Sequence, residues 1–408
     1  MTNSSPAPSL SSYQKLVIFL LAITQFTVVL DFMVMSPLGD IMMKSMNINT
    51  AQFGVAVSAY AFSAGISGLM TAGFADKYDR KKLLLFFYTG FVIGTFFCAL
   101  APNHFWLVAA RIVTGIFGGV IGSISLAIVA DLFDFQQRGK VMGFIQMGFG
   151  VSQVMGIPIG LYIANQWGWH VPFLTIAVLA AIIAIIILIK LQPLTAHLAL
   201  QQEHSVVKHL LHTITLKNHR IGFMSTALLS VGGFMMMPFG SAFAINNLKI
   251  STQQLPLLFM VTGVAALISM PLIGKMSDRV DRFKIFAIAT LVAAVVINIY
   301  AHYAATPFWI VLVTNVCMMV AIMSRMVPAS ALTSAIPEPQ YRGSFMSINA
   351  SLQQMAGGFG AMIAGWVIVQ KDRYAPLEHY DWLAMIATGT MIITIFLVYR
   401  VSKIVQKR

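Results

Sequence analysis

The sequence has few charged residues and few cysteines. Aspartate, glutamate, lysine and arginine together make up 10% of its 408 residues, while hydrophobic residues make up 58%. A soluble domain carries nearer to a quarter charged residues, so this composition excludes an ordinary soluble protein. The two cysteines, Cys98 and Cys317, both fall in apolar stretches, which argues against a disulfide framework. The chain is therefore predicted to be an integral membrane protein.

Several functional motifs are also missing. No GxxxxGK[ST] loop and no nucleophile constellation occurs, so neither ATP-driven transport nor an enzyme is expected. The first fourteen residues are polar and no small-residue cleavage site follows the first apolar run, which predicts an uncleaved first helix. His204, His209 and His212 lie close together, but no set of cysteines or carboxylates completes a metal site. The stretch SVVKHLLHTITLK is expected instead to form an amphipathic helix at the membrane surface. No metal and no cofactor is expected.

Long stretches without any charged residue alternate with short charged loops. A membrane-spanning helix needs about 20 apolar residues. The stretches at 141–189 and 285–324 are each broken by a turn-like segment, NQWGWH and HYAATP, so each is expected to hold two spans. Twelve spans are predicted, at residues 15–37, 51–74, 83–101, 105–130, 140–164, 171–191, 220–245, 253–274, 284–303, 308–335, 343–369 and 381–401.

The net charge of +13 has an uneven distribution along this topology. With the N-terminus in the cytoplasm, 20 of the 26 lysines and arginines lie on the cytoplasmic side, and the six tryptophans lie at the outer interface. Both biases are typical of inner-membrane proteins, so the basic charge needs no nucleic acid partner. The predicted protein is a multi-pass inner-membrane protein with both termini in the cytoplasm and the lipid bilayer as its partner.

Two loop sequences recur half a chain apart. AGFADKYDRKK at 72–82 resembles GKMSDRVDRFK at 274–284, and QQRGKVMG at 136–143 resembles QYRGSFMS at 340–347. The matched pairs are Asp76 with Asp278, Asp79 with Asp281, Arg80 with Arg282, and Arg138 with Arg342. The offsets of 202 and 204 are close to half the chain length, as expected for a duplicated six-helix unit. The predicted domains are residues 1–191 and 220–408, joined by a linker at 192–219.

These motifs resemble those of the major facilitator superfamily, in its twelve-helix drug:proton antiporter type. The family's loop between helices 2 and 3 reads Gly-x-Leu-Ala-Asp-Arg-x-Gly-Arg-Arg. The positions that fit this pattern here are Asp76, Lys77, Arg80 and Lys81, while Ala72 and Asp79 replace two glycines. The family's helix 4 pattern, Arg-x-x-x-Gly, is met by RIVTGIFGG at 111–119, and its helix 1 pattern by Asp31 and Pro37. The resemblance covers nearly the whole chain. It implies an all-α fold of two pseudo-symmetric six-helix bundles and alternating access driven by a proton gradient.

The antiporter motif of helix 5 is met only in part. The family has a Gly-Pro dipeptide with paired glycines after it, whereas this chain has Gly156, Pro158 and Gly160 in GIPIG. Proline removes one backbone hydrogen bond and glycine permits close helix approach. These residues are predicted to form a hinge, with ordinary helix packing as the alternative.

The resemblance implies that the doubled loops gate the cytoplasmic side. Charges at helix ends can pair with neighbouring helices and with helix dipoles. The residues predicted to form this gate are Asp76, Arg80, Arg138, Asp278, Arg282 and Arg342. Arg138 and Arg342 are expected to pair with Asp131, Asp134 or Glu338. The alternatives are that the basic residues only fix the topology, or that they are solvated helix ends.

Asp31 is the only one of the thirteen acidic residues that lies deep within a predicted span. At 1.5 Å per residue it lies about 24 Å from Lys15, at a depth that overlaps that of Arg111. Buried ionisable residues in a helical bundle pair with each other or face a wet cavity, so Asp31 and Arg111 are predicted to face each other. Burial disfavours a carboxylate and a guanidinium favours it, so this pair is predicted to take up and release the coupling proton. A static structural ion pair is the alternative.

Other side chains are candidates for the substrate site. Arg325 has no deep acid left as a partner, which suggests an anionic or carboxylate-bearing substrate, or carbonyl and water partners. Thr24, Thr27 and Met35 share the helical face of Asp31. The remaining candidates are Gln146, Gln153, Met236, Asn349 and Gln353. Amides and thioethers suit a broad, partly apolar ligand, although such residues often serve packing alone.

The predicted function is a monomeric, proton-coupled secondary transporter that exports small amphiphilic or anionic molecules by antiport. One alternative is a proton-driven importer of a nutrient or iron chelator, indicated by Arg325 and the incomplete helix 5 motif. The other is a lipid flippase or a membrane scaffold that moves no protons.

Overall fold

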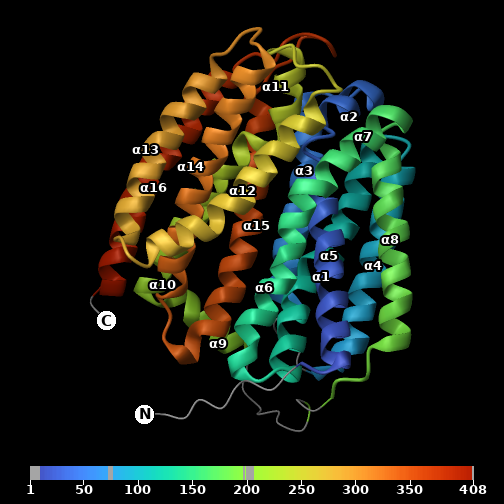
Figure 1. Cartoon of the computed structure of the whole chain (residues 1–408), viewed down its shortest axis with the longest axis vertical. Coiled ribbons are helices and arrows are strands. Elements are labelled where there is room, and N and C mark those ends of the chain that lie inside the picture. The colour runs from blue at the N-terminus through green and yellow to red at the C-terminus, as the bar shows by residue number, and fades with distance from the viewer. Residues whose placement is uncertain (1–9, 72–76, 196–197, 199–205, 407–408) are drawn as a thin grey trace.

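The computed structural model describes residues 10–71, 77–195, 198 and 206–406, and almost all of its regular structure is helical. Figure 1 shows two groups of long helices lying roughly along one axis. The start of α1 (Ser12–Val34) and the end of α16 (Tyr380–Gln406) lie at the same end of the molecule, here called the proximal end (Figure 1). The distal end carries the short helices α2 (Gly39–Met46) and α11 (Gly240–Asn246).

The first half of the chain forms one group of helices. After α1 and α2 come α3 (Thr50–Thr71), α4 (Arg80–Leu100), α5 (His104–Leu132), α6 (Phe135–Val151), α7 (Ile157–Trp167) and α8 (His170–Lys190). A five-residue π-helix, Ser152–Gly156, separates α6 from α7. α1 packs against α6 and α8, and α5 packs against α3 and α4.

The second half forms the other group. It contains α9 (Val206–Thr215), α10 (Lys217–Met235), α11, α12 (Leu255–Ser277), α13 (Arg282–Ala301), α14 (Phe308–Ser334), α15 (Arg342–Val367) and α16. A short 3₁₀ turn around Pro238 separates α10 from α11. α9 lies where the sequence predicts an amphipathic helix, within 192–219, although His204 lies outside the described residues.

Eleven helical stretches of the described residues are long and apolar enough to cross a membrane. They correspond to eleven of the twelve predicted spans, with Gln137–Trp167 and Lys217–Asn246 each counted across its break. The twelfth, predicted at 343–369, forms the 26-residue helix α15, which is more polar than the others. Because α15 packs against both α3 and α10, protein rather than lipid covers much of its surface.

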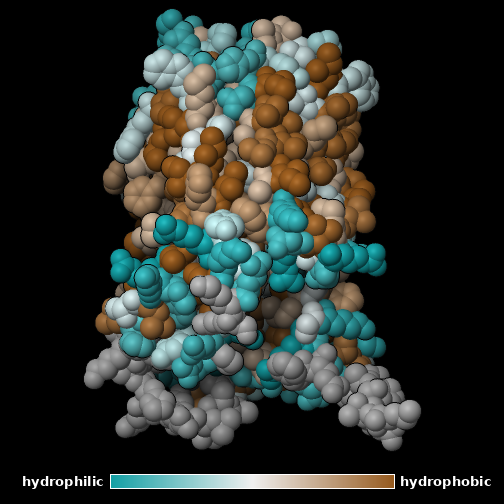
Figure 2. Space-filling model, turned by 90° about the vertical axis from the view of Figure 1, so that its left-hand side faces the viewer, coloured by the Kyte–Doolittle hydropathy of each residue, from teal (hydrophilic) through white to brown (hydrophobic). Residues whose placement is uncertain are grey.

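The hydropathy of the surface has the pattern typical of a membrane protein. Figure 2 shows a hydrophobic band across the upper and middle part of one face, with hydrophilic residues at both ends of the molecule. Exposed apolar side chains such as Ile288, Val295 and Phe396 lie on α13 and α16. A hydrocarbon layer can cover such a band without leaving apolar groups in water.

The aspartates Asp79 and Asp281, which recur in the two similar loops, have the same structural role. Asp79 caps the start of α4 by accepting a hydrogen bond from the Lys81 amide at 2.9 Å. Asp281 caps α13 in the same way, accepting from the Lys284 amide at 2.9 Å. Capping carboxylates satisfy free amides at a helix N-terminus, so the same residue type recurs where each half starts its third long helix.

The two halves meet along α3 and α15. The Thr50 hydroxyl donates to the Ile368 carbonyl at 2.7 Å, and the Ser58 hydroxyl donates to the Gly358 carbonyl at 2.8 Å. The helices come very close, because a Cβ built on Gly54 would lie 3.1 Å from the Cα of Gly365. Small residues allow this approach and form a continuous seam between the halves.

Candidate functional site

The central feature of the first half is a buried ion pair. Arg111 of α5 donates from Nη1 to Oδ2 of Asp31 on α1 at 2.8 Å, and both side chains are fully buried. The same Nη1 lies 3.4 Å from the Asp31 carbonyl oxygen. The structure thus brings together the two side chains that the sequence pairs by depth. Their role in proton coupling stays a prediction.

Two further helices complete the surroundings of this pair. Thr95 of α4 donates its hydroxyl to Oδ1 of Asp31 at 3.1 Å, so both carboxylate oxygens accept a hydrogen bond. On the other side, the Arg111 guanidinium carbon lies 4.5 Å from the centre of the Tyr60 ring of α3. An aromatic face attracts a cation, which helps to hold the guanidinium in place. Four helices therefore hold the pair.

Glycines in the 111–119 motif bring α3 close enough for this contact. A Cβ on Gly115 would overlap Ser63 Oγ and the Tyr60 carbonyl oxygen. A Cβ on Gly119 would come within 2.6 Å of the Ala64 Cα. The spacing of four residues puts both glycines on one face of α5. The Arg-x-x-x-Gly pattern thus places the arginine one turn from a tight contact that positions Tyr60 over it.

Part of the Arg111 guanidinium has no hydrogen-bond partner among the residues that the structure describes. Nε and Nη2 of Arg111 are buried and make no hydrogen bond to the described residues. Unpaired buried donors are costly, and they are uncommon in folded proteins. Arg111 therefore has donors available for a second acceptor when its contact with Asp31 changes.

An aromatic chain leads from the ion pair to the second half of the protein. The ring centre of Phe32 on α1 lies 5.2 Å from that of Tyr60 and 5.9 Å from that of Phe234 on α10. Tyr60 also contacts Arg111. The ion pair is thus two aromatic contacts away from α10, across the boundary between the halves.

The predicted substrate residues of α1 lie inside the first half. Thr24, Thr27 and Met35 are all fully buried. The Thr27 hydroxyl lies 2.8 Å from the Tyr88 hydroxyl of α4, and the Thr24 hydroxyl donates to the Leu20 carbonyl at 2.7 Å. Thr27 and Asp31 thus face α4 in this conformation, while Met35 is the first residue after α1. The contact of Thr24, Thr27 and Met35 with a substrate stays a prediction.

The other uncharged candidates lie nearer the boundary between the halves. Gln153 lies within the π-helix with its amide 3.6 Å from the sulfur of Met33, and Gln146 is exposed. Asn349, Gln353 and Met236 are half-buried. The side-chain oxygen of Asn349 is buried without a hydrogen-bond partner among the described residues, so it is free to accept one.

Arg325 lies apart from the Asp31–Arg111 pair. Its Nε donates to the Thr290 hydroxyl of α13 at 3.1 Å, and its guanidinium carbon lies 5.9 Å from the Phe286 ring centre. No carboxylate of the described residues forms an ion pair with it. The side chain is nearly fully buried between α13 and α14, so in this conformation it packs within the second half.

Sequence comparison places the chain in a known family. Residues 21–239 and 222–407 both match the family described as Major Facilitator Superfamily. The chain belongs to this superfamily. The predicted superfamily and the predicted fold are confirmed, while the drug:proton antiporter type stays a prediction.

Superfamily relatives align over nearly their full length. YbcL of Bacillus subtilis (strain 168), named an uncharacterized MFS-type transporter, is 25% identical over 394 residues, which cover 94% of this chain and 95% of YbcL. A bacterial homologue of the human lysosomal transporter Spinster superposes with a TM-score of 0.80 at 15% identity, over 98% and 99% of the two chains. A D-xylose–proton symporter gives 0.77 at 17% identity, over 95% and 97%. At these identities the two structures support the shared fold alone.

The predicted gate residues of this superfamily member make contacts at the proximal end. Arg80 forms an ion pair from Nε to Oδ2 of Asp131 at 3.1 Å, between α4 and the end of α5. Arg138 donates to the main-chain carbonyls of Phe133 and Ala130, at 2.9 and 2.6 Å, and so caps the end of α5. The contacts of Arg138 are thus with backbone oxygens rather than with the carboxylates expected from the sequence.

The gate residues of the second half are more exposed. Arg282, the first residue of α13, lies 3.6 Å from Asp278, which follows the end of α12, and both are substantially exposed to solvent. Arg342 is exposed at the start of α15. Asp76 lies outside the described residues. The described contacts of Arg80, Arg138 and Arg282 each join residues of the same half. Their role in closing the proximal end between the halves stays a prediction.

The GIPIG segment coincides with the break between α6 and α7. The π-helix ends at Gly156, and Pro158 stands in the first turn of α7. A Cβ on Gly156 would lie 2.6 Å from Leu30, and one on Gly160 would lie 3.0 Å from Val34. π-helical turns inside α-helices occur often at functional sites. The break is compatible with the predicted hinge and with tight packing against α1.

The sequence alone misses a polar cluster at the distal end, here called the distal clasp: Asp40, Lys44 and Asn246. Lys44 pairs with Asp40 at 2.8 Å, and Asn246 of the other half donates to Asp40 at 2.6 Å. Lys44 also donates to the side-chain oxygen of Asn246 at 3.1 Å. Asp40 lies just past the end of the first predicted span. The spacing of four between Asp40 and Lys44 signals a helical ion pair, but nothing in the sequence links them to Asn246.

Proposed function

We propose that this protein is a proton-coupled transporter that exports small amphiphilic or anionic molecules in exchange for protons. The observation that carries the proposal is the fully buried Asp31–Arg111 pair in a membrane-spanning half. An ion pair buried in a transporter is costly to maintain and is a natural site for proton binding. YbcL, a relative over nearly the whole chain, is named as a transporter. The drug:proton antiporter motifs of the sequence support the direction.

The contacts of the pair suggest how a proton would act. Neutral Asp31 would attract Arg111 less strongly, while Arg111 would keep its charge and its unpaired Nε and Nη2 donors. The guanidinium would then turn toward another acceptor and shift against Tyr60, which it contacts. Proton uptake from outside, a change in the packing of the halves and release inside would complete one cycle, with substrate leaving in the opposite direction.

The proposal also includes the membrane location, the oligomeric state and the energy source of the transporter. The excess of lysine and arginine in the proximal loops supports a cytoplasmic location for that end. We propose an inner-membrane protein with both termini in the cytoplasm that works as a monomer. The proton gradient supplies the energy, and no cofactor or metal takes part.

Transport by the purified protein in proteoliposomes tests this function. Fluorescein as an amphiphilic anion and ethidium as an amphiphilic cation serve as probes, with a pH gradient imposed across the membrane. Gradient-driven flux is expected for the wild type and a loss of at least tenfold for Asp31→Asn. The matched control is Asp134→Asn, because Asp134 is an exposed carboxylate whose side chain does not cap its helix.

The direction of flux separates the alternatives. Flux of a probe against the imposed proton flow supports export by antiport, whereas flux along with the protons would favour an importer. Probe flux that responds neither to the gradient nor to Asp31→Asn would refute proton coupling through this pair.

A further inference from the structure

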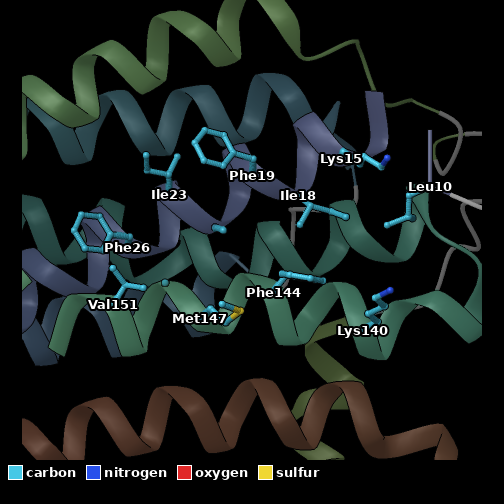
Figure 3. A pocket seen from close by; sticks show the side chains of 12 residues that line it. Leu10, Lys15, Ile18, Phe19, Ile23, Phe26, Lys140, Phe144, Met147 and Val151 are labelled. Atoms are coloured by element: carbon cyan, nitrogen blue, oxygen red, sulfur yellow. The ribbon is translucent and has the colours of Figure 1, made fainter. Parts of the chain in front are cut away.

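A surface groove of about 650 Å³ lies between α1 and α6 in the proximal half of the molecule. Its wall is almost wholly apolar and includes Phe19, Phe26, Phe144 and Met147. Figure 3 shows α1 and α6 side by side, with these side chains along the groove. The groove does not include Asp31, Arg111 or any other candidate of the transport site.

The groove opens toward the membrane rather than toward the boundary between the halves. Phe19 is 62% exposed and Met147 is 57% exposed, which only lipid can cover favourably. Beyond the groove the same stripe of the broken helix continues with exposed Met155 and Ile159. Gln146 and Gln153 of this helix, which are candidates for the substrate site, lie on a different face. The groove therefore belongs to the lipid-facing surface.

Its length matches one leaflet of a bilayer. From Lys15 to Phe26 on α1, eleven residues at 1.5 Å per residue give about 16 Å. The same count separates Lys140 from Val151 on α6. The hydrocarbon core of a bilayer is about 30 Å thick, so about 15 Å belongs to each leaflet. The groove can thus hold an acyl chain along its whole path through one leaflet.

The only charged residues of the lining stand together at one end. Figure 3 shows Lys15 and Lys140 at the proximal end, and Phe26 and Val151 at the other. Both lysines are exposed, and no carboxylate of the described residues pairs with either of them. Lys15 belongs to α1 and Lys140 to α6. Their proximity therefore does not follow from the spacing of residues along one helix. At the depth where a leaflet's headgroups lie, two free ammonium groups attract an anionic phosphate.

We propose that this groove is a binding site for an anionic phospholipid of the leaflet at the proximal end. The acyl chain lies between α1 and α6 against the phenylalanine and methionine side chains, and the phosphate lies between Lys15 and Lys140. The site requires only that the chain spans a membrane and does not depend on proton coupling. The lipid covers the apolar wall that the protein leaves exposed and neutralises two charges at once.

Native mass spectrometry of the full chain, released from nanodiscs of mixed composition, tests the proposal. The probe lipids are phosphatidylglycerol and phosphatidylcholine with identical palmitoyl and oleoyl chains. Each lysine near the headgroups is expected to favour binding of the anionic lipid by about 1 kcal/mol. Because 1.4 kcal/mol corresponds to a tenfold change in affinity, two lysines predict about a 30-fold preference for phosphatidylglycerol. The double variant Lys15→Gln/Lys140→Gln is expected to lose most of this preference. Lys190→Gln/Lys284→Gln, which removes two exposed lysines outside the groove, is expected to keep it.

A third variant tests the apolar part of the site. Met147→Trp fills the groove and leaves both lysines intact, and because Met147 is exposed it does not disturb the core. It is expected to reduce the bound phosphatidylglycerol severalfold. Equal retention of both lipids by the wild type, or the same loss in both double-lysine variants, would overturn the proposal. A dimer that disappears on Met147→Trp would also overturn it, because a second copy of the chain would then occupy the groove.

Discussion

Removing one partner of the Asp31–Arg111 pair is expected to cost far more stability than removing both. The two changes to compare are Asp31→Asn, which preserves shape, and Arg111→Met, which preserves length without charge. Each leaves one charge at a site with no exposed surface and no other described ion partner. The double variant leaves no charge at all.

The magnitude follows from this burial. Breaking a buried pair by removing one partner costs about 3–5 kcal/mol, because the remaining charge is uncompensated, while replacing both partners with neutral groups is often close to neutral. In the Asp31→Asn variant the Thr95 hydroxyl can still donate to the new amide oxygen, as it donates to the carboxylate at 3.1 Å, which favours the lower figure for this change. The interaction energy in the double-mutant cycle is therefore expected to be at least about 3 kcal/mol.

Reversible unfolding in mixed detergent micelles measures the free energy of each variant. The matched control is a cycle on Asp278 and Arg282, which lie 3.6 Å apart and are substantially exposed. An exposed pair is worth about 0–1 kcal/mol, so this second cycle should be nearly additive. If the Asp31–Arg111 cycle is also additive within about 0.5 kcal/mol, the carboxylate and the guanidinium do not stabilise each other, and the reasoning fails.

Three further perturbations test other parts of the structure. In Gly115→Ala the new methyl group would overlap Ser63 and the Tyr60 carbonyl. The free energy of unfolding should fall by about 1–3 kcal/mol in the same assay. The control is Gly139→Ala, whose methyl group meets open space and should not lower the free energy of unfolding. Asp40→Asn removes the charge that binds Lys44 in the distal clasp. The distribution of distances between spin labels on α2 and α11 should then become broader and shift to longer values. An unchanged distribution would show that the clasp does not hold the halves together. Phe32→Ala removes the ring that contacts both Tyr60 and Phe234. It should reduce gradient-driven flux severalfold and leave the Asp31–Arg111 interaction energy unchanged. A variant with wild-type flux would exclude this contact from coupling.

Much of the fold can be predicted because a bilayer imposes simple requirements. Eleven stretches of the sequence are apolar enough to be found by hydropathy alone. The twelfth, α15, is indicated by its lack of charged residues rather than by strong hydropathy, since it carries polar residues such as Asn349 and Gln353. The break at Ser152–Gly156 lies where Gly156 and Pro158 suggest one, but its π-helical form does not follow from these two residues.

The ion pair can also be predicted, because depth along a helix follows from residue count. The sequence does not reveal which neighbour covers each face. Helical spacing puts Thr24, Thr27 and Asp31 on one face, yet only the tertiary structure shows that Tyr88 and Thr95 of α4 cover it. The distal clasp escapes sequence analysis for the same reason, since Asp40 and Asn246 are 206 residues apart in sequence and meet only across the two halves.

The position of the pair within its half bears on how a proton could move the whole protein. Asp31 and Arg111 are sealed inside the first half, and their described contacts all lie within that half. A local change there must reach the other half through side chains that connect the two. Tyr60 and Phe32 together form such a connection, because Tyr60 contacts Arg111 and Phe32, and Phe32 contacts Phe234 of α10. Tyr60 also stands on α3, whose other face forms the seam with α15. A shift of the guanidinium would therefore act through Tyr60 on two of the contacts between the halves, the Phe32–Phe234 contact and the α3–α15 seam. The tight glycine packing that places Tyr60 over Arg111 is for this reason part of the proposed coupling, together with the two charges.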